Sequence, residues 1–116
     1  MENENEVRVI KKLCAPGACN NIVEVLGMGE LHGQSEYYNY FIDMELCEMN
    51  LAHYMSNVSQ SFPRFVRGRD VTSSLKATQI WNVMTHITRG VEFIHGQKEI
   101  HRDLKPSNST SHVGCI

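Results

Sequence analysis

The most regular hydrophobic pattern in the chain lies between residues 80 and 94. Five large apolar side chains recur there at intervals of four, three, four and three residues: Ile80, Met84, Ile87, Val91 and Ile94. This spacing predicts an amphipathic helix whose apolar stripe is buried in a core. Thr78 is a candidate cap for its start. Gly90 lies inside the pattern, where glycine costs about 1 kcal/mol relative to alanine, which indicates that another part of the chain packs closely against it.

Two shorter helices are predicted earlier in the chain. Residues 6–13 place apolar side chains at helical spacing, and a proline followed by a glycine ends this pattern. Asn50 is a candidate N-cap for a short helix over residues 51–55. Residues 56–74 are polar and irregular, with one proline and three arginines, so they predict a surface loop.

A pair of strands is predicted between these two helices. Residues 22–26 are rich in β-branched side chains and are followed by Gly27 and Gly29. Residues 37–46 are rich in aromatic and apolar side chains. Residues 29–36 contain glycine and serine and suit a hairpin connection. The pattern therefore predicts an α+β chain with one antiparallel pair of strands.

Composition is typical of globular proteins and argues against several kinds of partner. The 116 residues, 41% hydrophobic and 21% charged, suffice for one ordinary domain with one core. A formal charge of −2 provides no basic surface field, so we expect neither nucleic acid nor membrane as a partner. No apolar run reaches the length of a membrane-spanning helix, and the acidic first residues are unlike a secretory signal. We therefore expect an intracellular, cytoplasmic protein.

The cysteines fit that compartment as free thiols. They are Cys14, Cys19, Cys47 and Cys115. A disulfide framework is typical of small secreted scaffolds, and this chain has neither their composition nor an export signal. Zinc sites usually combine two pairs of ligands, and the pair formed by Cys14 and Cys19 has no second pair in the sequence. Reduced thiols are the simpler interpretation, with metal binding as the alternative.

The chemistry is concentrated in the eight residues after the long predicted helix. Residues 101–108 read His-Arg-Asp-Leu-Lys-Pro-Ser-Asn, which matches the pattern His-Arg-Asp-x-x-x-x-Asn of the protein kinase catalytic loop at every defined position. The context fits as well, because a long amphipathic helix ending at residues 93–96 lies directly upstream. A solvated charged loop that spells the motif by chance is the alternative. The sequence resembles the middle of a eukaryotic-type protein kinase domain, and Lys105 resembles the serine/threonine branch.

The resemblance implies a role for three residues of this loop. Asp103 would accept the proton of a substrate hydroxyl as it attacks the γ-phosphate of ATP. Asn108 would hold a Mg²⁺ ion on the phosphates, and Lys105 would offset the negative charge of the transferring phosphoryl group. ATP, Mg²⁺ and a protein substrate are therefore the implied cofactors and partners.

The resemblance extends backwards over most of the chain. Glu6 resembles the ion-pair glutamate of the family's helix C, with a solvated helix glutamate as the alternative. Residues 41–48 resemble the fifth strand and the hinge between the lobes. In that register Met44 is the gatekeeper beside the adenine site, or alternatively an ordinary core methionine. The backbones of Glu45 and Cys47 would hydrogen-bond the edge of the adenine.

The sequence also departs from the family pattern. No Gly-rich phosphate loop and no lysine-bearing strand precede Glu6, and no Asp-Phe-Gly follows Asn108. Residues 109–116 resemble nothing in the family. We therefore expect residues 1–108 to be a partial protein kinase domain and residues 109–116 to be an unrelated short tail.

These observations predict a fold and two alternative functions. The fold is α+β, a partial kinase-like arrangement of part of the small lobe, the hinge and the first helices of the large lobe. The resemblance implies an ATP-dependent protein serine/threonine kinase. The alternative is a catalytically inactive kinase-like fragment that acts at most as a binding module, and this is the expected behaviour of the 116 residues alone.

Overall fold

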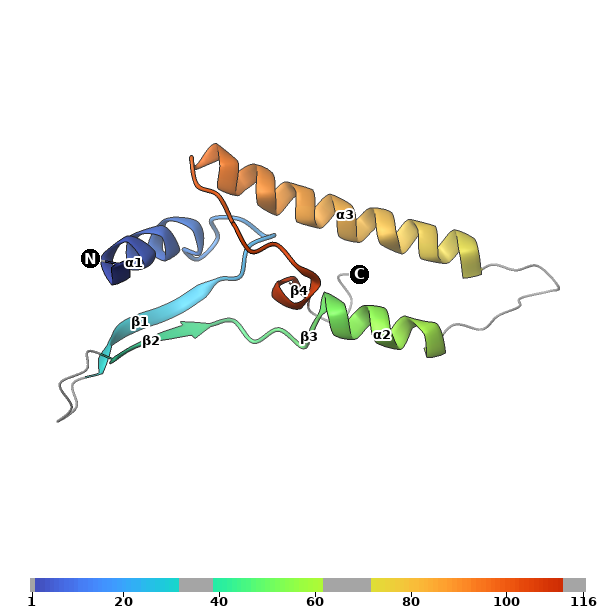
Figure 1. The fold of residues 1–116 in the computed structure, drawn as a ribbon, viewed down its shortest axis with the longest axis horizontal. Helices are drawn as coiled ribbons and strands as arrows, with labels where there is room; N and C mark the ends of the chain where they lie inside the picture. Colours follow the sequence, from blue (N-terminus) through green and yellow to red (C-terminus); the bar gives the residue numbers. More distant parts are fainter. Residues whose placement is uncertain (1, 32–38, 62–71, 112–116) are drawn as a thin grey trace.

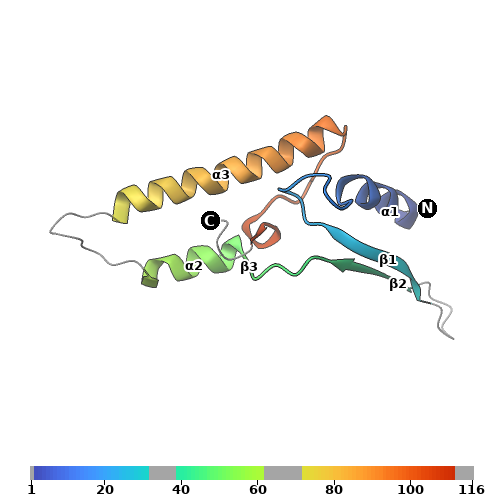
Figure 2. The same ribbon diagram turned by 180° about the vertical axis from the view of Figure 1, so that it is seen from behind.

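The described part of the chain consists of three α-helices and two small sheets (Figure 1). The computed structural model describes residues 2–31, 39–61 and 72–111. In chain order the elements are α1 (Glu2–Leu13), β1 (Val25–Leu31), β2 (Asn39–Met44), β3 (Met49–Asn50), α2 (Leu51–Ser61), α3 (Thr72–Gly96), the 3₁₀-helix η1 (Pro106–Asn108) and β4 (Thr110–Ser111). Both views place α1 and the β1–β2 hairpin at one end and α2 at the other, with α3 running between the two ends (Figures 1 and 2).

Helix α1 confirms the first predicted helix. Its last turn carries Lys11 and Lys12, whose positive charges oppose the negative end of the helix dipole. The N–H of Cys14 still donates to the carbonyl of Ile10 at 2.8 Å, and the chain then turns away at the proline and glycine. The helix therefore ends where the sequence indicates.

Strands β1 and β2 form the predicted antiparallel hairpin, but with different bounds. β1 begins at Val25 and runs through Gly27 and Gly29, which the sequence pattern placed outside the strand. β2 ends at Met44, which pairs with Val25, so residues 45 and 46 are not part of it. Gly29 pairs with Phe41, and a Cβ atom at Gly29 would lie 2.8 Å from Cε1 of that ring. The glycine thus marks close packing of an aromatic ring and not the end of a strand.

Helix α2 begins as predicted and is longer than predicted. The side-chain Oδ1 of Asn50 accepts a hydrogen bond from the backbone N–H of His53 at 2.8 Å, so Asn50 is an N-cap. The helix continues past the predicted end at Met55 as far as Ser61. The first part of the predicted loop is therefore helical.

The end of the predicted loop over residues 56–74 also needs correction. Helix α3 already begins at Thr72, so the last residues of the predicted loop are helical and Thr78 lies inside the helix and does not cap it. Residues 62–71 of the predicted loop lie outside the described residues, as do residues 32–36 of the predicted hairpin connection and residues 37 and 38 of the second predicted strand.

A second sheet joins the segment before α2 to the residues after η1. The two residues of β3 pair with the two residues of β4 in antiparallel register. Next to them, the N–H of Leu51 donates to the carbonyl of Ser109 at 2.7 Å. Residues 109–111, which the sequence analysis assigned to an unrelated tail, thus make regular backbone pairs. The domain boundary at Asn108 stays a prediction.

Only one end of the apolar stripe on α3 is buried. Ile94 is 5% exposed and, with Leu13 at 9%, forms the buried hydrophobic core of the described residues. By contrast Ile80 is 62% exposed and Met84 is 51% exposed, so the prediction that the stripe is buried in a core holds only at its C-terminal end. The reason is visible in both views, where the first half of α3 extends away from α1 and the hairpin (Figures 1 and 2).

The overall dimensions agree with this small core. The principal extents are 65 × 33 × 23 Å and the radius of gyration is 18.4 Å. A compact chain of this length has a radius of gyration of about 13 Å. The molecule is therefore elongated, and the elements that carry its site residues pack around only a small core. Among the described residues, no helix is long and apolar enough to cross a membrane.

Candidate functional site

The loop after α3 is shaped by two unusual backbone conformations and a histidine. Lys98 and Arg102 have φ angles of 61° and 66°, in the left-handed region that non-glycine residues seldom adopt. The N–H of Asp103 donates to Nδ1 of His101 at 3.2 Å. His101 therefore holds the backbone of the residue that the sequence analysis singles out as the base.

Three of the predicted site residues meet at one carboxylate. The side-chain Nδ2 of Asn108 donates to Oδ2 of Asp103 at 2.8 Å and to its backbone carbonyl at 3.0 Å. The ammonium Nζ of Lys105 lies 3.0 Å from the same Oδ2. The side chains of Asp103 and Lys105 are 65% and 50% exposed, so the cluster is open to a ligand. The structure thus brings Asp103, Lys105 and Asn108 together.

The short helix η1 is what turns Asn108 back toward Asp103. Pro106 occupies its first turn, where the missing N–H costs nothing and the fixed φ favours helical geometry. The N–H of Asn108 donates to the carbonyl of Lys105 at 3.0 Å and closes the turn. A tight turn of this kind is why a five-residue spacing in the sequence becomes a direct contact in space.

The donor set at this cluster suits a magnesium ion in part. Both contacts from the Asn108 amide to Asp103 use its nitrogen, which leaves the side-chain oxygen to act as a ligand. Mg²⁺ prefers oxygen ligands and is usually bound by one or two protein groups together with substrate phosphates. Within the described ranges, no cluster of three or more His, Cys, Asp or Glu side chains could hold a metal by itself. The residues therefore fit a metal that arrives with phosphates.

The predicted hinge residues occupy the segment between β2 and β3. Met44 ends β2 and is 57% exposed, so it is not a core methionine in this structure. Glu45 and Glu24 bind each other twice: the N–H of Glu45 donates to the carbonyl of Glu24 at 2.9 Å, and Oε1 of Glu45 accepts from the N–H of Glu24 at 2.8 Å. Because the N–H of Glu45 already donates to the carbonyl of Glu24, this N–H is not available to an adenine.

Glu6 lies on α1 and is bound by a residue that the sequence analysis missed. The hydroxyl of Tyr40, on β2, donates to Oε2 of Glu6 at 3.1 Å. This hydrogen bond, with burial and the charge of the carboxylate, raises the pKa of Tyr40. Glu6 is thus joined to the hairpin and not to the cluster around Asp103. Tyr40 belongs to an aromatic run, and nothing in its spacing indicates the contact.

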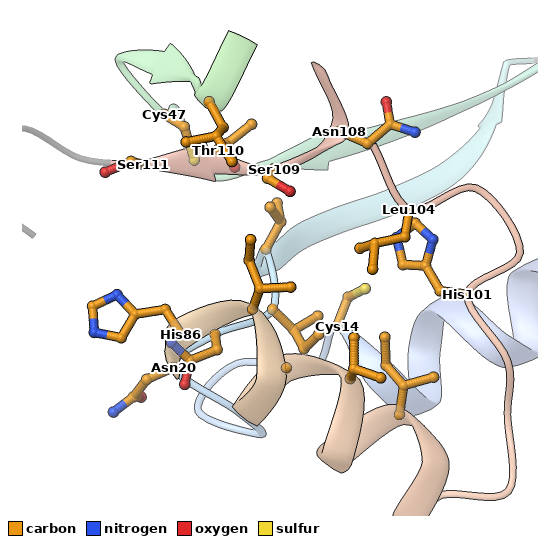
Figure 3. A pocket seen from close by; sticks show the side chains of 18 of the residues that line it. Cys14, Asn20, Cys47, His86, His101, Leu104, Asn108, Ser109, Thr110 and Ser111 are labelled. Carbon is orange, nitrogen blue, oxygen red and sulfur yellow. The ribbon is translucent and has the colours of Figure 1, made fainter. Parts of the chain in front are cut away.

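A cavity of about 420 Å³ connects the hinge with the loop after α3 (Figure 3). Its wall includes Glu45 and Cys47 from the hinge, and His101, Leu104 and Asn108 from the loop. Residues 109–111 also line it, although the sequence analysis treated them as an unrelated tail. Hinge and loop therefore face one shared cavity.

The opposite wall of the cavity is formed by α3, the end of α1 and the connection between α1 and β1. Figure 3 shows Cys14 and His86 across the cavity from Cys47 and Thr110. Burial raises the pKa of the Cys14 thiol, so the neutral form is favoured and Cys14 is a poor nucleophile. The three cysteines in the described residues are free thiols, in agreement with the sequence analysis.

Comparison with known proteins finds similarity to protein kinases. The family model for the protein kinase domain matches residues 1–110. The meiosis induction protein kinase IME2/SME1 of Saccharomyces cerevisiae is 32% identical over 110 residues, which cover 93% of this chain and 14% of that protein. The mitosis inhibitor protein kinase wee1 of Schizosaccharomyces pombe is 30% identical over 89 residues, 77% of this chain and 8% of that protein.

A shorter match covers a more similar segment. The probable serine/threonine-protein kinase ifkC of Dictyostelium discoideum is 49% identical over 35 residues, which are 30% of this chain and 2% of that protein. The chain thus spans only a small part of the curated relatives that it matches. The match of the family model over nearly the whole chain confirms the resemblance and the partial kinase-like α+β fold. The chain belongs to the protein kinase family.

Proposed function

We propose that this chain supplies the catalytic loop and the hinge of an ATP-dependent protein kinase that phosphorylates serine or threonine hydroxyls. The observation that carries the proposal is the position of the Asp103 carboxylate, bound at Oδ2 by the amide of Asn108 at 2.8 Å and the ammonium of Lys105 at 3.0 Å. A general base needs a fixed carboxylate with one accessible oxygen, and this arrangement provides both.

The two carboxylate oxygens of Asp103 would have different roles. Oδ2 is occupied by Asn108 and Lys105, so Oδ1 is the oxygen that would accept the proton of the substrate hydroxyl. The positive charge of Lys105, held beside that carboxylate, would favour a negatively charged phosphoryl group at the same place. Asp103 is thereby the proposed base, and Lys105 the proposed electrostatic partner.

The remaining proposed roles concern ATP and its metal. Asn108 would hold a Mg²⁺ ion through its side-chain oxygen, and a bound Mg²⁺ ion neutralises phosphate charge. The carbonyl of Glu45 and the backbone of Cys47 would hydrogen-bond the adenine, with Met44 beside it. The support for the roles of Glu45, Cys47 and Asn108 is the shared cavity, which all three line. The role of Met44 is what the resemblance implies. Glu6, on α1, would take the role of the ion-pair glutamate of helix C, on the side of the ATP site that holds the phosphates.

The serine/threonine preference rests on Lys105 and on one relative. Lys105 stands two residues after Asp103, as in the serine/threonine branch that the sequence resembles. The ifkC relative, 49% identical over its matched segment, is named as a probable serine/threonine-protein kinase. Another relative, 31% identical over 77 residues, is named as a tyrosine- and threonine-specific kinase, so the acceptor residue has to be measured directly.

A second candidate function is binding without catalysis. Its supporting observation is the exposed apolar face of α3, where Ile80 is 62% exposed and Trp81 is 72% exposed. Large exposed apolar side chains at adjacent positions are typical of surfaces that bind a partner. In this alternative the catalytic loop is a structural element only.

A transfer assay with phosphoamino acid analysis separates the two candidates. The longest product of the gene that contains this chain is incubated with labelled ATP, Mg²⁺ and a basic protein substrate. The kinase proposal expects phosphoserine or phosphothreonine, lost in Asp103→Asn and kept in Asp43→Asn, a matched change at an exposed position of β2. Label on tyrosine alone would refute the serine/threonine preference, and equal transfer by both variants would refute the role of Asp103.

A further inference from the structure

Two cations of α1 converge on one carboxylate beside the catalytic loop. Oε1 of Glu99 accepts from Nη1 of Arg8 at 3.2 Å and from Nζ of Lys12 at 3.3 Å. Arg8 and Lys12 are one helical turn apart and therefore lie on the same face of α1. The side chain of Glu99 is only 19% exposed, although its partners are 55% and 36% exposed. The side chain of Glu99 is thus more covered than either of its partners.

The segment that carries Glu99 is a structured turn. The N–H of Lys98 donates to the carbonyl of His95 at 2.9 Å, and the N–H of Glu99 donates to the carbonyl of Ile94 at 3.1 Å, the two bonds of a Schellman motif. The first residue after the helix cap in this motif has a left-handed backbone and is usually glycine. Here that residue is Lys98, which has a φ of 61°. The turn thus directs the Glu99 side chain and the following residues.

A third contact joins α1 to the same turn. The ammonium of Lys12 donates to the backbone carbonyl of Gln97 as well as to Glu99. Lys12 therefore binds the turn at two points, one of which does not depend on any side chain of the turn. A single surface ion pair contributes little, but a carboxylate with two cations and an added backbone acceptor is a network.

The network joins the helix that carries Glu6 to the segment that leads to Asp103. Glu99 precedes His101 and Asp103 in the segment that enters the catalytic loop, and Arg8 follows Glu6 on α1. Figures 1 and 2 both show α1 beside the C-terminal end of α3 and the chain that leaves it. A shift of α1 would therefore pull directly on the start of the loop.

We propose that Arg8, Lys12 and Glu99 form a clamp that fixes α1, and with it Glu6, to the segment entering the catalytic loop. Glu99 is a positioning residue in this account, because it acts through α1 and through the backbone that leads to Asp103. The functional meaning of the clamp rests on the proposed function, since it assumes the roles of Glu6 and Asp103. The existence of the clamp does not, so the two can fail separately.

Hydrogen exchange measured by mass spectrometry on the chain, without nucleotide, tests the clamp. Glu99→Gln removes the charge and keeps the shape, and we expect exchange to become about fivefold faster in α1 and in residues 100–104, with α2, β3 and β4 unchanged. Glu92→Gln is the matched control, since Glu92 is an exposed glutamate on α3, seven residues before Glu99. It should leave exchange in both regions unchanged.

Salt and charge reversal separate an electrostatic clamp from simple packing. Raising the salt from about 0.05 M to about 1 M should speed exchange in wild-type α1 and have little effect in Glu99→Gln. Glu99→Lys should loosen α1 further, and adding Arg8→Glu, which leaves Lys12 and its hydrogen bond to the carbonyl of Gln97 in place, should restore part of its protection. This rescue remains informative even when the single reversal is unstable.

Two results would overturn the proposal. Unchanged exchange in α1 of Glu99→Gln would show that no clamp holds the helix. Faster exchange in α1 with unchanged exchange in residues 100–104 would show that the clamp does not reach the catalytic loop. Neither result depends on phosphoryl transfer, so the absence of kinase activity does not affect the test.

Discussion

Gly90 of α3 lies directly against the backbone of Asn21, in the connection between α1 and β1. A Cβ atom at Gly90 would be 2.8 Å from the carbonyl oxygen of Asn21 and 3.5 Å from Cδ1 of Ile22. The first distance is below any normal contact of a Cβ atom, and a backbone oxygen cannot rotate away as a side chain can. This contact explains the glycine inside the helix and confirms that another segment packs closely against it.

Replacing Gly90 by alanine should therefore destabilise the chain. Alanine gains about 1 kcal/mol of helix propensity, but the forced separation from Asn21 should cost about 1–3 kcal/mol and outweigh that gain. Urea unfolding followed by circular dichroism measures the difference. Gly96→Ala is the control, because a Cβ atom there would meet nothing within 4 Å. A higher unfolding midpoint for Gly90→Ala than for wild type would refute the close contact.

Lys98→Gly should stabilise the turn before the catalytic loop. Lys98 has a φ of 61°, a conformation that costs a non-glycine residue about 1–2 kcal/mol. Glycine removes that strain but gains freedom in the unfolded chain, so we expect a net increase in the free energy of unfolding of about 1 kcal/mol. Lys98→Ala keeps the strain and should be close to wild type. Equal midpoints for the glycine and alanine variants would show that the backbone strain is absent.

The clamp should give stability a specific dependence on pH. The hydrogen bond from Lys12, supported by Arg8 and opposed by partial burial, lowers the pKa of Glu99 from its ordinary value of 4.5. Because the folded-state pKa is the lower one, the contribution of Glu99 is present above pH 4.5 and is lost as the pH falls through the folded-state pKa.

Thermal unfolding as a function of pH checks this sign. Wild type should exceed Glu99→Gln in melting temperature at neutral pH, and the difference should shrink as the solution is acidified below pH 4.5. Glu92→Gln should run parallel to wild type throughout. A difference between wild type and Glu99→Gln that grows on acidification would contradict the assignment.

The 116 residues by themselves should not transfer phosphate at a measurable rate. They contain no Gly-rich phosphate loop, no lysine-bearing strand and no Asp-Phe-Gly. In the family the first two parts hold the phosphates, and the Asp of Asp-Phe-Gly is the second metal ligand. The purified chain is incubated with labelled ATP, Mg²⁺ and a basic protein, beside Asp103→Asn. Transfer by the wild-type chain above that of the variant would show that these parts are dispensable.

The turn that brings Asp103, Lys105 and Asn108 together is local, whereas their assigned roles stay predictions. Asp103, Lys105 and Asn108 lie within one short turn, Pro106 favours that turn, and the contacts follow from the spacing. The N-cap at Asn50 was predictable for the same reason, since it binds a backbone N–H only three residues away. Contacts between residues only a few positions apart can be predicted from the sequence.

Features that depend on distant parts of the chain were not predictable. Arg8 and Glu99 are 91 positions apart, and no periodicity connects them. The shifted bounds of β1 depend on the ring of Phe41 in the partner strand, which covers Gly29. The apolar stripe of α3 predicted a core, but burial requires a covering element, and Ile80 lacks one among the described residues. A periodic pattern shows which face is apolar and does not show what covers it.

The most direct test of the account is the steady-state kinetics of Asp103→Ala and Asn108→Ala in the longest product of the gene that has kinase activity. As proposed base, Asp103 should act in the transition state, so Asp103→Ala should lower kcat by about 10²- to 10⁴-fold and leave the KM for ATP within a few-fold. Asn108→Ala should lower kcat and also raise the KM for ATP, with partial recovery at high Mg²⁺. Asp43→Ala, the matched control on β2, should change neither constant. An Asp103→Ala enzyme that kept its turnover at saturating ATP while losing nucleotide affinity would contradict the account.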